Sequence, residues 1–148
     1  MKTIEQNILE IDHGIICHQV NCQGVMGAGL AESIAKKWPR TKRDYVEALE
    51  TGKLVLGGIW FSMINTTLLI AHIAGQDQYG RQKQHTDYGA VREGIRGLRR
   101  VIDGHALYSG LPIYFPHGFG CGLGGGDWNT MFKIIEEEIP RAIICKLR

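Results

Sequence analysis

The sequence VNCQGVMGAGLA, residues 20–31, joins the end of an apolar strand to the start of a helix. Residues 14–20 form the strand, and the run Ile15-Ile16-Cys17 is typical of a strand buried on both faces. Three glycines fall within residues 24–29, although a tight turn needs only one. Glycine lets the backbone approach a ligand, and N–H groups at a helix start attract an anion. The stretch therefore fits two interpretations, a phosphate-binding loop and a structural turn.

A second stretch with the same organisation lies near the C-terminus, where residues 113–128 have the sequence IYFPHGFGCGLGGGDW. Six of the nine residues from 118 to 126 are glycine, which is costly in chain entropy and unusual for a purely structural loop. Two strand–loop–helix units in one small protein predict one bound diphosphate that is held from both sides.

Two nucleotide-binding motifs do not fit this second stretch. Gly120, Gly122 and Gly125 formally match GxGxxG, but a dinucleotide-binding unit should carry an acidic residue about 20 positions further on. The residue at that distance is Cys145. No glycine is followed by Lys-Ser or Lys-Thr, so a Walker loop is absent as well. The missing acidic residue, together with the chain length, disfavours an NAD-dependent oxidoreductase.

The composition is that of a globular protein. The chain has 148 residues, 44% hydrophobic and 22% charged, and we expect a single domain over 1–148. A net charge of +2 without a run of lysine or arginine predicts no direct nucleic-acid partner. Four cysteines without a CxxC pair predict free thiols, a cytoplasmic protein and no zinc site. We expect no membrane span and no signal peptide.

Strands and helices alternate along most of the chain. The predicted strands are 3–10, 14–20, 58–63, 67–74, 111–116 and 143–147, and the predicted helices are 28–38, 41–49, 86–102 and 127–138. This order predicts an α/β fold, a three-layer α/β/α sandwich with a mixed, mostly parallel central sheet. Ligands of such sheets bind beyond the carboxyl ends of the strands, so both glycine loops should share one edge.

Several polar residues fall near that edge. His18 ends the second strand and is either a catalytic group or a hydrogen-bonded core histidine. Asn21 is suited both to bonding a ribose and to forming the turn. Asp77, in the polar loop with Gln76 and Arg81, is suited to orienting a water molecule, although a solvated loop explains it equally well.

Two residues of the second stretch have further interpretations. We expect Phe119 to be an exposed aromatic residue that covers a ribose or a phosphate. Asp127 is best explained as the cap of the last helix, and its alternative is a catalytic carboxylate.

The two glycine stretches resemble those of the macro domain family, which binds ADP-ribose, and the similarity covers nearly the whole chain. Residues 18–31 look like the family's first ribose and phosphate loop, and residues 116–128 look like its second phosphate loop. Trp38-Pro39 and Asp44-Tyr45 are most similar to two branches. One branch contains the ADP-ribose 1''-phosphate phosphatases, and the other removes terminal ADP-ribose from protein carboxylates or DNA bases.

The resemblance implies a role for many residues. Asn21 matches an asparagine that contacts the distal ribose, and Asn7 stands where many members have an aspartate that bonds adenine. The ligand-binding residues implied in this way are Asn7, Ile8, Asn21, Gly27, Ala28, Gly29, Gly118, Phe119, Gly120, Cys121, Gly122, Leu123 and Gly124.

The resemblance also implies a choice between two reactions. His18 matches a histidine implicated in catalysis in the phosphatase branch. The glycohydrolase branch uses a lysine after the 67–74 strand and an aspartate after Gly-Cys-Gly-Leu. This chain has Gly75-Gln76-Asp77 and Gly124 at those places, and Lys83 is not carried over to that role. The lysine–aspartate mechanism is therefore disfavoured.

These residues predict hydrolysis of ADP-ribose 1''-phosphate to ADP-ribose and phosphate. His18, with Asp77, activates water or protonates the leaving oxygen, and an ordinary histidine pKa of about 6.5 suits either task. No cofactor and no metal are expected. The alternatives are a non-catalytic ADP-ribose reader and an ADP-ribosyl glycohydrolase that acts on protein or DNA adducts.

Overall fold

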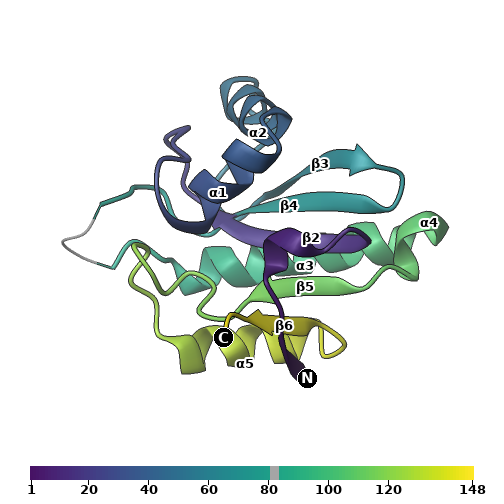
Figure 1. Cartoon of the computed structure of the whole chain (residues 1–148). Helices are drawn as coiled ribbons and strands as arrows, with labels where there is room; N and C mark the ends of the chain where they lie inside the picture. The colour runs from purple at the N-terminus through teal and green to yellow at the C-terminus, as the bar shows by residue number, and fades with distance from the viewer. Residues whose placement is uncertain (81–83) are drawn as a thin grey trace.

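Six strands form one mixed sheet in the order β1-β6-β5-β2-β4-β3 (Figure 1). The computed structural model describes residues 1–80 and 84–148. Every neighbouring pair is parallel except β3 and β4, which are antiparallel. The strands are β1 (Lys2–Glu5), β2 (Gly14–Val20), β3 (Ile59–Asn65), β4 (Leu68–Ala74), β5 (Ile113–Pro116) and β6 (Ile143–Lys146). The predicted mixed, mostly parallel sheet is confirmed.

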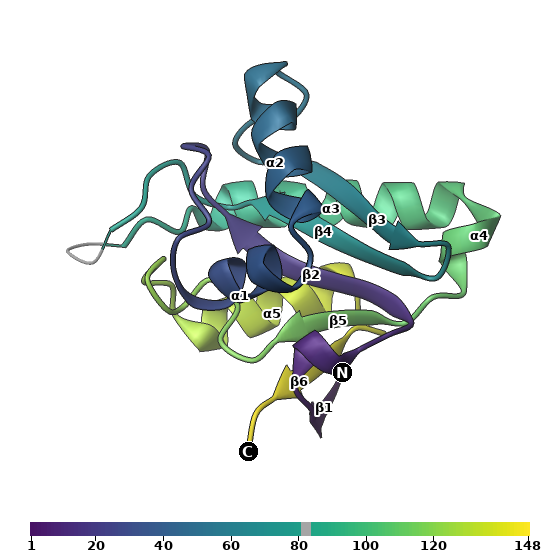
Figure 2. The same cartoon turned by 45° about the horizontal axis from the view of Figure 1, so that its top comes forward.

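Helices cover both faces of this sheet (Figures 1 and 2). The helices α1 (Gly29–Lys37) and α2 (Arg40–Glu50) lie on one face with the 3-10 turn η1 (Ile8–Glu10). The helices α3 (Tyr88–Gly104) and α5 (Trp128–Glu138) lie on the other face, and the short α4 (Ala106–Ser109) follows α3. The expected three-layer α/β/α sandwich is therefore confirmed.

The alternation of side chains along β2 divides the interior into two cores. Ile16 and Val20 pack towards α1 and α2, whereas Ile15 and Cys17 pack towards α3 and α5. All seven residues of β4 are buried as well, because helices cover both faces of the central strands. His18 consequently points to the α1 side, and Gln19 points to the α3 side.

Two predicted element ends are wrong for local reasons. The first strand ends at Glu5 instead of residue 10, because Asn7 accepts a hydrogen bond from the Leu9 N–H at 3.0 Å and caps η1. The helix predicted over 41–49 begins at Arg40 as α2, and Thr41 is buried in its first turn, where its hydroxyl donates to the Trp38 carbonyl. Both η1 and α4 were absent from the sequence-based expectation.

No helix in the part of the chain that the structure describes has the length and apolarity needed to cross a membrane. The four cysteines are free thiols, as expected.

Candidate functional site

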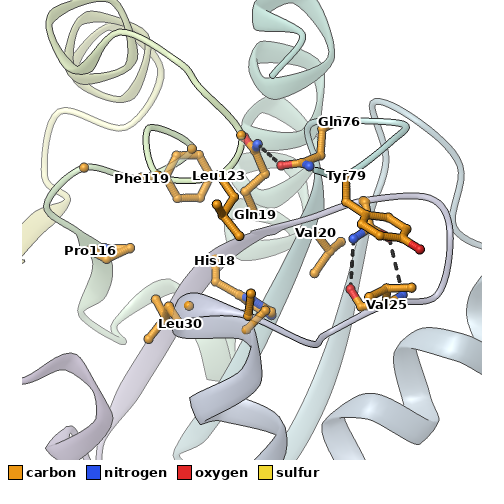
Figure 3. Close-up of a pocket in the computed structure, with 18 of the residues that line it drawn as sticks. His18, Gln19, Val20, Val25, Leu30, Gln76, Tyr79, Pro116, Phe119 and Leu123 are labelled. Carbon is orange, nitrogen blue, oxygen red and sulfur yellow. Dashed lines mark hydrogen bonds between the residues drawn. The ribbon is translucent and has the colours of Figure 1, made fainter. Parts of the chain in front are cut away.

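A cavity of about 530 Å³ lies at the carboxyl edge of the sheet, between the loops that follow β2, β4 and β5 (Figure 3). Because these strands are parallel, their carboxyl ends meet at one edge. The structure thus brings both glycine stretches to one cavity. The predicted site residues that line it are His18, Asn21, Gly27, Ala28, Gly29, Gly118, Phe119, Gly120, Gly122, Leu123 and Gly124.

The first loop presents the start of α1 to the cavity. Gly29, Leu30 and Ala31 form the first turn of α1 and line the cavity. The first N–H groups of a helix have no partner within it, and Ala28 makes no side-chain cap. Gly29 has a φ of +60°, a conformation that favours glycine. This end of α1 is consequently suited to an anion.

Asn21 shapes the first loop from within. Its Oδ1 accepts from the Gln23 N–H at 2.9 Å, and its Nδ2 donates to the Val25 carbonyl at 2.9 Å. The Tyr45 hydroxyl donates to the same Oδ1 at 2.7 Å, and burial raises the pKa of Tyr45 to about 12, so this proton stays in place. The turn-forming role of Asn21 is therefore evident, and its contact with a ribose stays a prediction.

The second loop differs from the expectation at two residues. Phe119 is not exposed: its ring is buried and packs edge-on against Phe115, with 5.1 Å between ring centroids. Phe119 borders the cavity but belongs to the core because the loop turns inward at this point. Cys121 does not line the cavity; its thiol donates to the Phe119 carbonyl, and burial raises its pKa to about 11.

Among the residues that the structure describes, the lining of the cavity contains no carboxylate, lysine or arginine side chain. An anion here would be held by backbone N–H groups and by the end of α1. Within the same described ranges, His, Cys, Asp and Glu form no cluster that could hold a metal ion.

His18 belongs to a buried chain of hydrogen bonds. Its Nε2 lies 2.7 Å from His72 Nδ1, and His72 Nε2 lies 2.9 Å from the Ser62 hydroxyl. Burial, together with the charge of His72, lowers the pKa of His18 well below 6.5, and burial lowers that of His72 to about 3. His18 is therefore neutral at neutral pH. The expected ordinary histidine pKa is wrong for this residue.

Asp77 does not accompany His18. It is exposed and absent from the cavity lining, and its carboxylate accepts hydrogen bonds from Gln23 and Gln78. Its backbone carbonyl accepts from the Cys22 N–H, so Asp77 connects the loop after β4 to the loop after β2. The structure does not bring together the two residues expected to act in catalysis. Arg81 and Lys83 lie outside the described residues.

Asn7 and Ile8 lie beside a second, shallower region. Asn7 borders a hollow of about 350 Å³ with Glu5 and Arg148, at the carboxyl ends of β1 and β6. Ile8 is buried in the core beneath α1 and α2. The side-chain oxygen of Asn7, Oδ1, already accepts the hydrogen bond that caps η1. Both residues follow β1, whose carboxyl end lies at the same edge of the sheet as the cavity, but neither residue lines the cavity.

Several lining residues were missed from the sequence. Gln19, Tyr79 and His117 border the cavity. Thr86 accepts a hydrogen bond from Gln19 and donates one to the Gly120 carbonyl. Gln19 carried the clearest signal, because a long polar side chain next to the end of a fully buried strand needs a polar partner. Asp127 is the cap of α5, as expected: its carboxylate accepts from the Thr130 N–H at 3.0 Å.

The sequence was compared with known proteins. No family profile matches it. It is 27% identical over 146 residues to an ADP-ribose 1''-phosphate phosphatase from Saccharomyces cerevisiae, covering 83% of this chain and 82% of the relative. It is 25% identical over 142 residues to a DNA ADP-ribosyl glycohydrolase from Thermus aquaticus, covering 94% of this chain and 38% of the relative.

Solved structures share the fold over nearly the whole chain. A protein of unknown function from Bacteroides thetaiotaomicron has a TM-score of 0.85 and 25% identity, covering 99% of this chain and 97% of that one. The macrodomain of Thermus aquaticus DarG has a TM-score of 0.79 and 22% identity over 99% and 97%. Thermosipho africanus DarTG, solved with ADP-ribose, has a TM-score of 0.77 and 18% identity over 99% and 41%.

The fold and the cavity define an α/β/α protein with a glycine-lined site at the carboxyl edge of its sheet. The chain has the fold of the macrodomains, and its sequence is similar to that of an ADP-ribose 1''-phosphate phosphatase.

Proposed function

We propose that this protein binds ADP-ribose in the cavity and hydrolyses ADP-ribose 1''-phosphate to ADP-ribose and phosphate. The observation that carries the proposal is a cavity between two glycine loops and the start of α1, whose described lining contains no Asp, Glu, Lys or Arg. Such a lining suits a diphosphate that accepts hydrogen bonds from the backbone. The relative from Saccharomyces cerevisiae, with 82% of its length matched, supports the phosphatase activity.

In this proposal the diphosphate lies between Gly27–Gly29 and Gly118–Gly124. The distal ribose lies towards Asn21, and the adenosine end extends along the sheet edge towards Asn7 and Ile8. The edge itself supports this direction, because β2, β5, β6 and β1 are parallel neighbours whose carboxyl ends form one continuous row.

Hydrolysis adds the oxygen of water to phosphorus and breaks the bond between phosphorus and the 1''-oxygen, which leaves as the ribose hydroxyl after gaining a proton. His18 is the candidate for moving this proton. Burial lowers its pKa well below 6.5. A phosphate dianion placed beside it would raise that pKa, since an opposite charge favours the protonated ring.

Two measurements test the proposal. Calorimetry with ADP-ribose, NAD and AMP should show binding of ADP-ribose, and incubation with ADP-ribose 1''-phosphate should release inorganic phosphate. His18→Ala should abolish phosphate release and leave the affinity for ADP-ribose nearly unchanged. His13→Ala is the matched control, because His13 is exposed and outside the cavity. Full activity of the His18 variant would contradict the role of His18.

A non-catalytic reader of ADP-ribose is the second candidate. Two observations favour it. Asp77 lies outside the cavity, and His18 Nδ1 is buried with no hydrogen-bond partner among the residues that the structure describes. Tight binding of ADP-ribose without release of phosphate would support the reader. Glycohydrolysis of protein or DNA adducts, suggested by the relative from Thermus aquaticus, is tested by the release of ADP-ribose from such adducts.

We also propose a cytoplasmic location. Its support is the set of four free thiols, since reducing compartments keep cysteines in this state.

A further inference from the structure

Gln19 uses both protons of its side-chain amide to join two loops at the cavity. Its Nε2 donates to Gln76 Oε1 at 2.7 Å and to the Thr86 hydroxyl at 2.8 Å. Figure 3 shows the bond between Gln19 and Gln76 above the cavity. Gln76 and Thr86 are buried and also form an isolated β-bridge, so the amide of Gln19 meets a part of the chain that is already folded together.

The direction of these hydrogen bonds is set by their surroundings. Gln76 donates its own Nε2 to the Gln78 carbonyl at 2.7 Å, so its Oε1 faces Gln19. Gln19 must therefore present its nitrogen, and a carboxylate at position 19 would face two acceptors. A long apolar side chain would fill the same space without donating either hydrogen bond.

Thr86 extends the connection to the second glycine loop. Its hydroxyl donates to the Gly120 carbonyl at 2.7 Å, and its backbone N–H donates to the Gly124 carbonyl at 2.9 Å. The Gly120 carbonyl also accepts from the Gly126 N–H at 2.9 Å. One threonine thus holds two residues of this loop that border the cavity.

Three glycines fit around the amide of Gln19. A Cβ atom added at Gly75 or Gly120 would lie 2.6 or 2.7 Å from Gln19 Oε1, and one at Gly124 would lie 3.0 Å from Nε2. The distances at Gly75 and Gly120 would force the amide of Gln19 to move and so break its hydrogen bonds. At Gly124 the added Cβ would also lie 2.6 Å from the Thr86 hydroxyl oxygen, and Gly120 has a φ of +72°. Glycine at these three positions therefore leaves the space that the amide of Gln19 occupies.

We propose that Gln19 is a positioning residue that sets the conformation of the second glycine loop through Thr86 and thereby the affinity for the diphosphate of ADP-ribose. This inference rests on the proposed function for the identity of the ligand. The shaping of the loop is a property of the free protein and can be measured without any ligand.

The experiment compares Thr86→Val, Thr86→Ser and Gln19→Met with the wild type. Valine and methionine keep the approximate volume and remove the hydrogen bonds, whereas serine keeps the hydroxyl. ADP-ribose affinity is measured by calorimetry, and amide hydrogen exchange is measured in the free protein. Ile134→Val, a mild change in the core on α5, is the control for a loss of stability alone.

We expect Thr86→Val and Gln19→Met to weaken ADP-ribose binding roughly tenfold, the equivalent of about one hydrogen bond. We also expect faster exchange of the amides in residues 118–126. Thr86→Ser should restore both values, and Ile134→Val should change neither. Wild-type affinity together with unchanged amide exchange in Thr86→Val and Gln19→Met would overturn the proposal.

The two proposals fail in different ways. If the wild type does not bind ADP-ribose, the proposed function fails, and the exchange of residues 118–126 alone decides whether Gln19 and Thr86 position the loop. If Ile134→Val weakens binding as much as Thr86→Val does, the effect is one of general stability and the positioning role is refuted. Gln19→Met keeps the test decisive if Thr86→Val does not fold.

Discussion

At the scale of single residues, burial determines the chemistry of the site more than residue type does. His18 and His72 occupy paired positions on β2 and β4 and bond to each other in the interior. Water cannot solvate a charge on either ring, so both rings stay neutral over a wide range of pH. Phe119 is buried as well, so its ring is not exposed as expected.

The buried histidine pair makes stability depend on pH. His72 has a pKa of about 3 in the folded protein and an ordinary value of about 6.5 when unfolded. Between these values the unfolded chain binds the extra proton, so the free energy of unfolding falls as the pH falls below about 6.5, by up to about 1.4 kcal/mol per pH unit. The lowered pKa of His18 acts in the same direction.

Urea denaturation at a series of pH values from 7.5 to about 4 measures this slope. His72→Gln should flatten it. His13→Gln is the control and should not change it, because His13 is exposed. An equally steep slope in the His72 variant would show that other groups cause the pH dependence.

Gly122→Val should block the binding of ADP-ribose while leaving the fold intact. A Cβ atom at Gly122 meets no protein atom within 4 Å, and the residue lines the cavity, so the new side chain would occupy ligand space. Calorimetry should show a loss of affinity of about tenfold or more. Gly110→Val, at another open position outside the cavity, should bind normally. Normal binding by the Gly122 variant would count against the cavity as the site.

At the scale of elements, β2 organises the site because it pairs with both β4 and β5. Its last residues alternate between the two faces, so His18 enters one core and Gln19 meets the loops of the other side. Of the helices, α1 supplies a cavity wall with its first turn, and it starts without a side-chain cap. By contrast, α5 is capped by Asp127 and lies outside the cavity lining.

Asp127→Ala should destabilise the protein by about 1 kcal/mol, the usual cost of losing a helix cap. The Asp127 carboxylate accepts from both the N–H and the hydroxyl of Thr130. Asparagine caps equally well, so Asp127→Asn should stay close to the wild type in chemical denaturation. Retained phosphate release by Asp127→Asn would also distinguish a cap from a catalytic carboxylate.

At the scale of the whole molecule, helices cover both faces of a largely parallel sheet (Figure 2). The loops after β2, β4 and β5 are far apart in sequence but border the same cavity. A ligand that binds there contacts segments from both halves of the chain. Its binding free energy consequently stabilises the fold as a unit.

Saturating ADP-ribose should therefore raise the melting temperature. At a concentration of 100 times Kd, the folded state gains about 2.7 kcal/mol, which corresponds to a shift of several degrees for a chain of this size. Differential scanning fluorimetry measures the shift. Gly122→Val should show at most about half of that gain in stability at the same concentration, because its affinity is at least tenfold lower. An equal shift in that variant would place the ligand elsewhere.

The sequence by itself determined the class of fold, the two glycine loops and their meeting at one edge. Alternation of strands and helices and the density of glycine are local properties, and the topology of parallel sheets does the rest. Asp127 as a helix cap and the stripe of apolar residues along α3 were local in the same sense.

Only the tertiary structure decided the state of His18, the exclusion of Asp77 from the cavity, the burial of Phe119 and the role of Gln19. Three of these depend on residues distant in sequence: His72 beside His18, Gln23 beside Asp77 and Thr86 next to Gln19. The burial of Phe119 depends on the core that strands and helices from different parts of the chain form around it. Burial and hydrogen-bond partners set a side chain's charge and direction, and neither is a property of the residue alone.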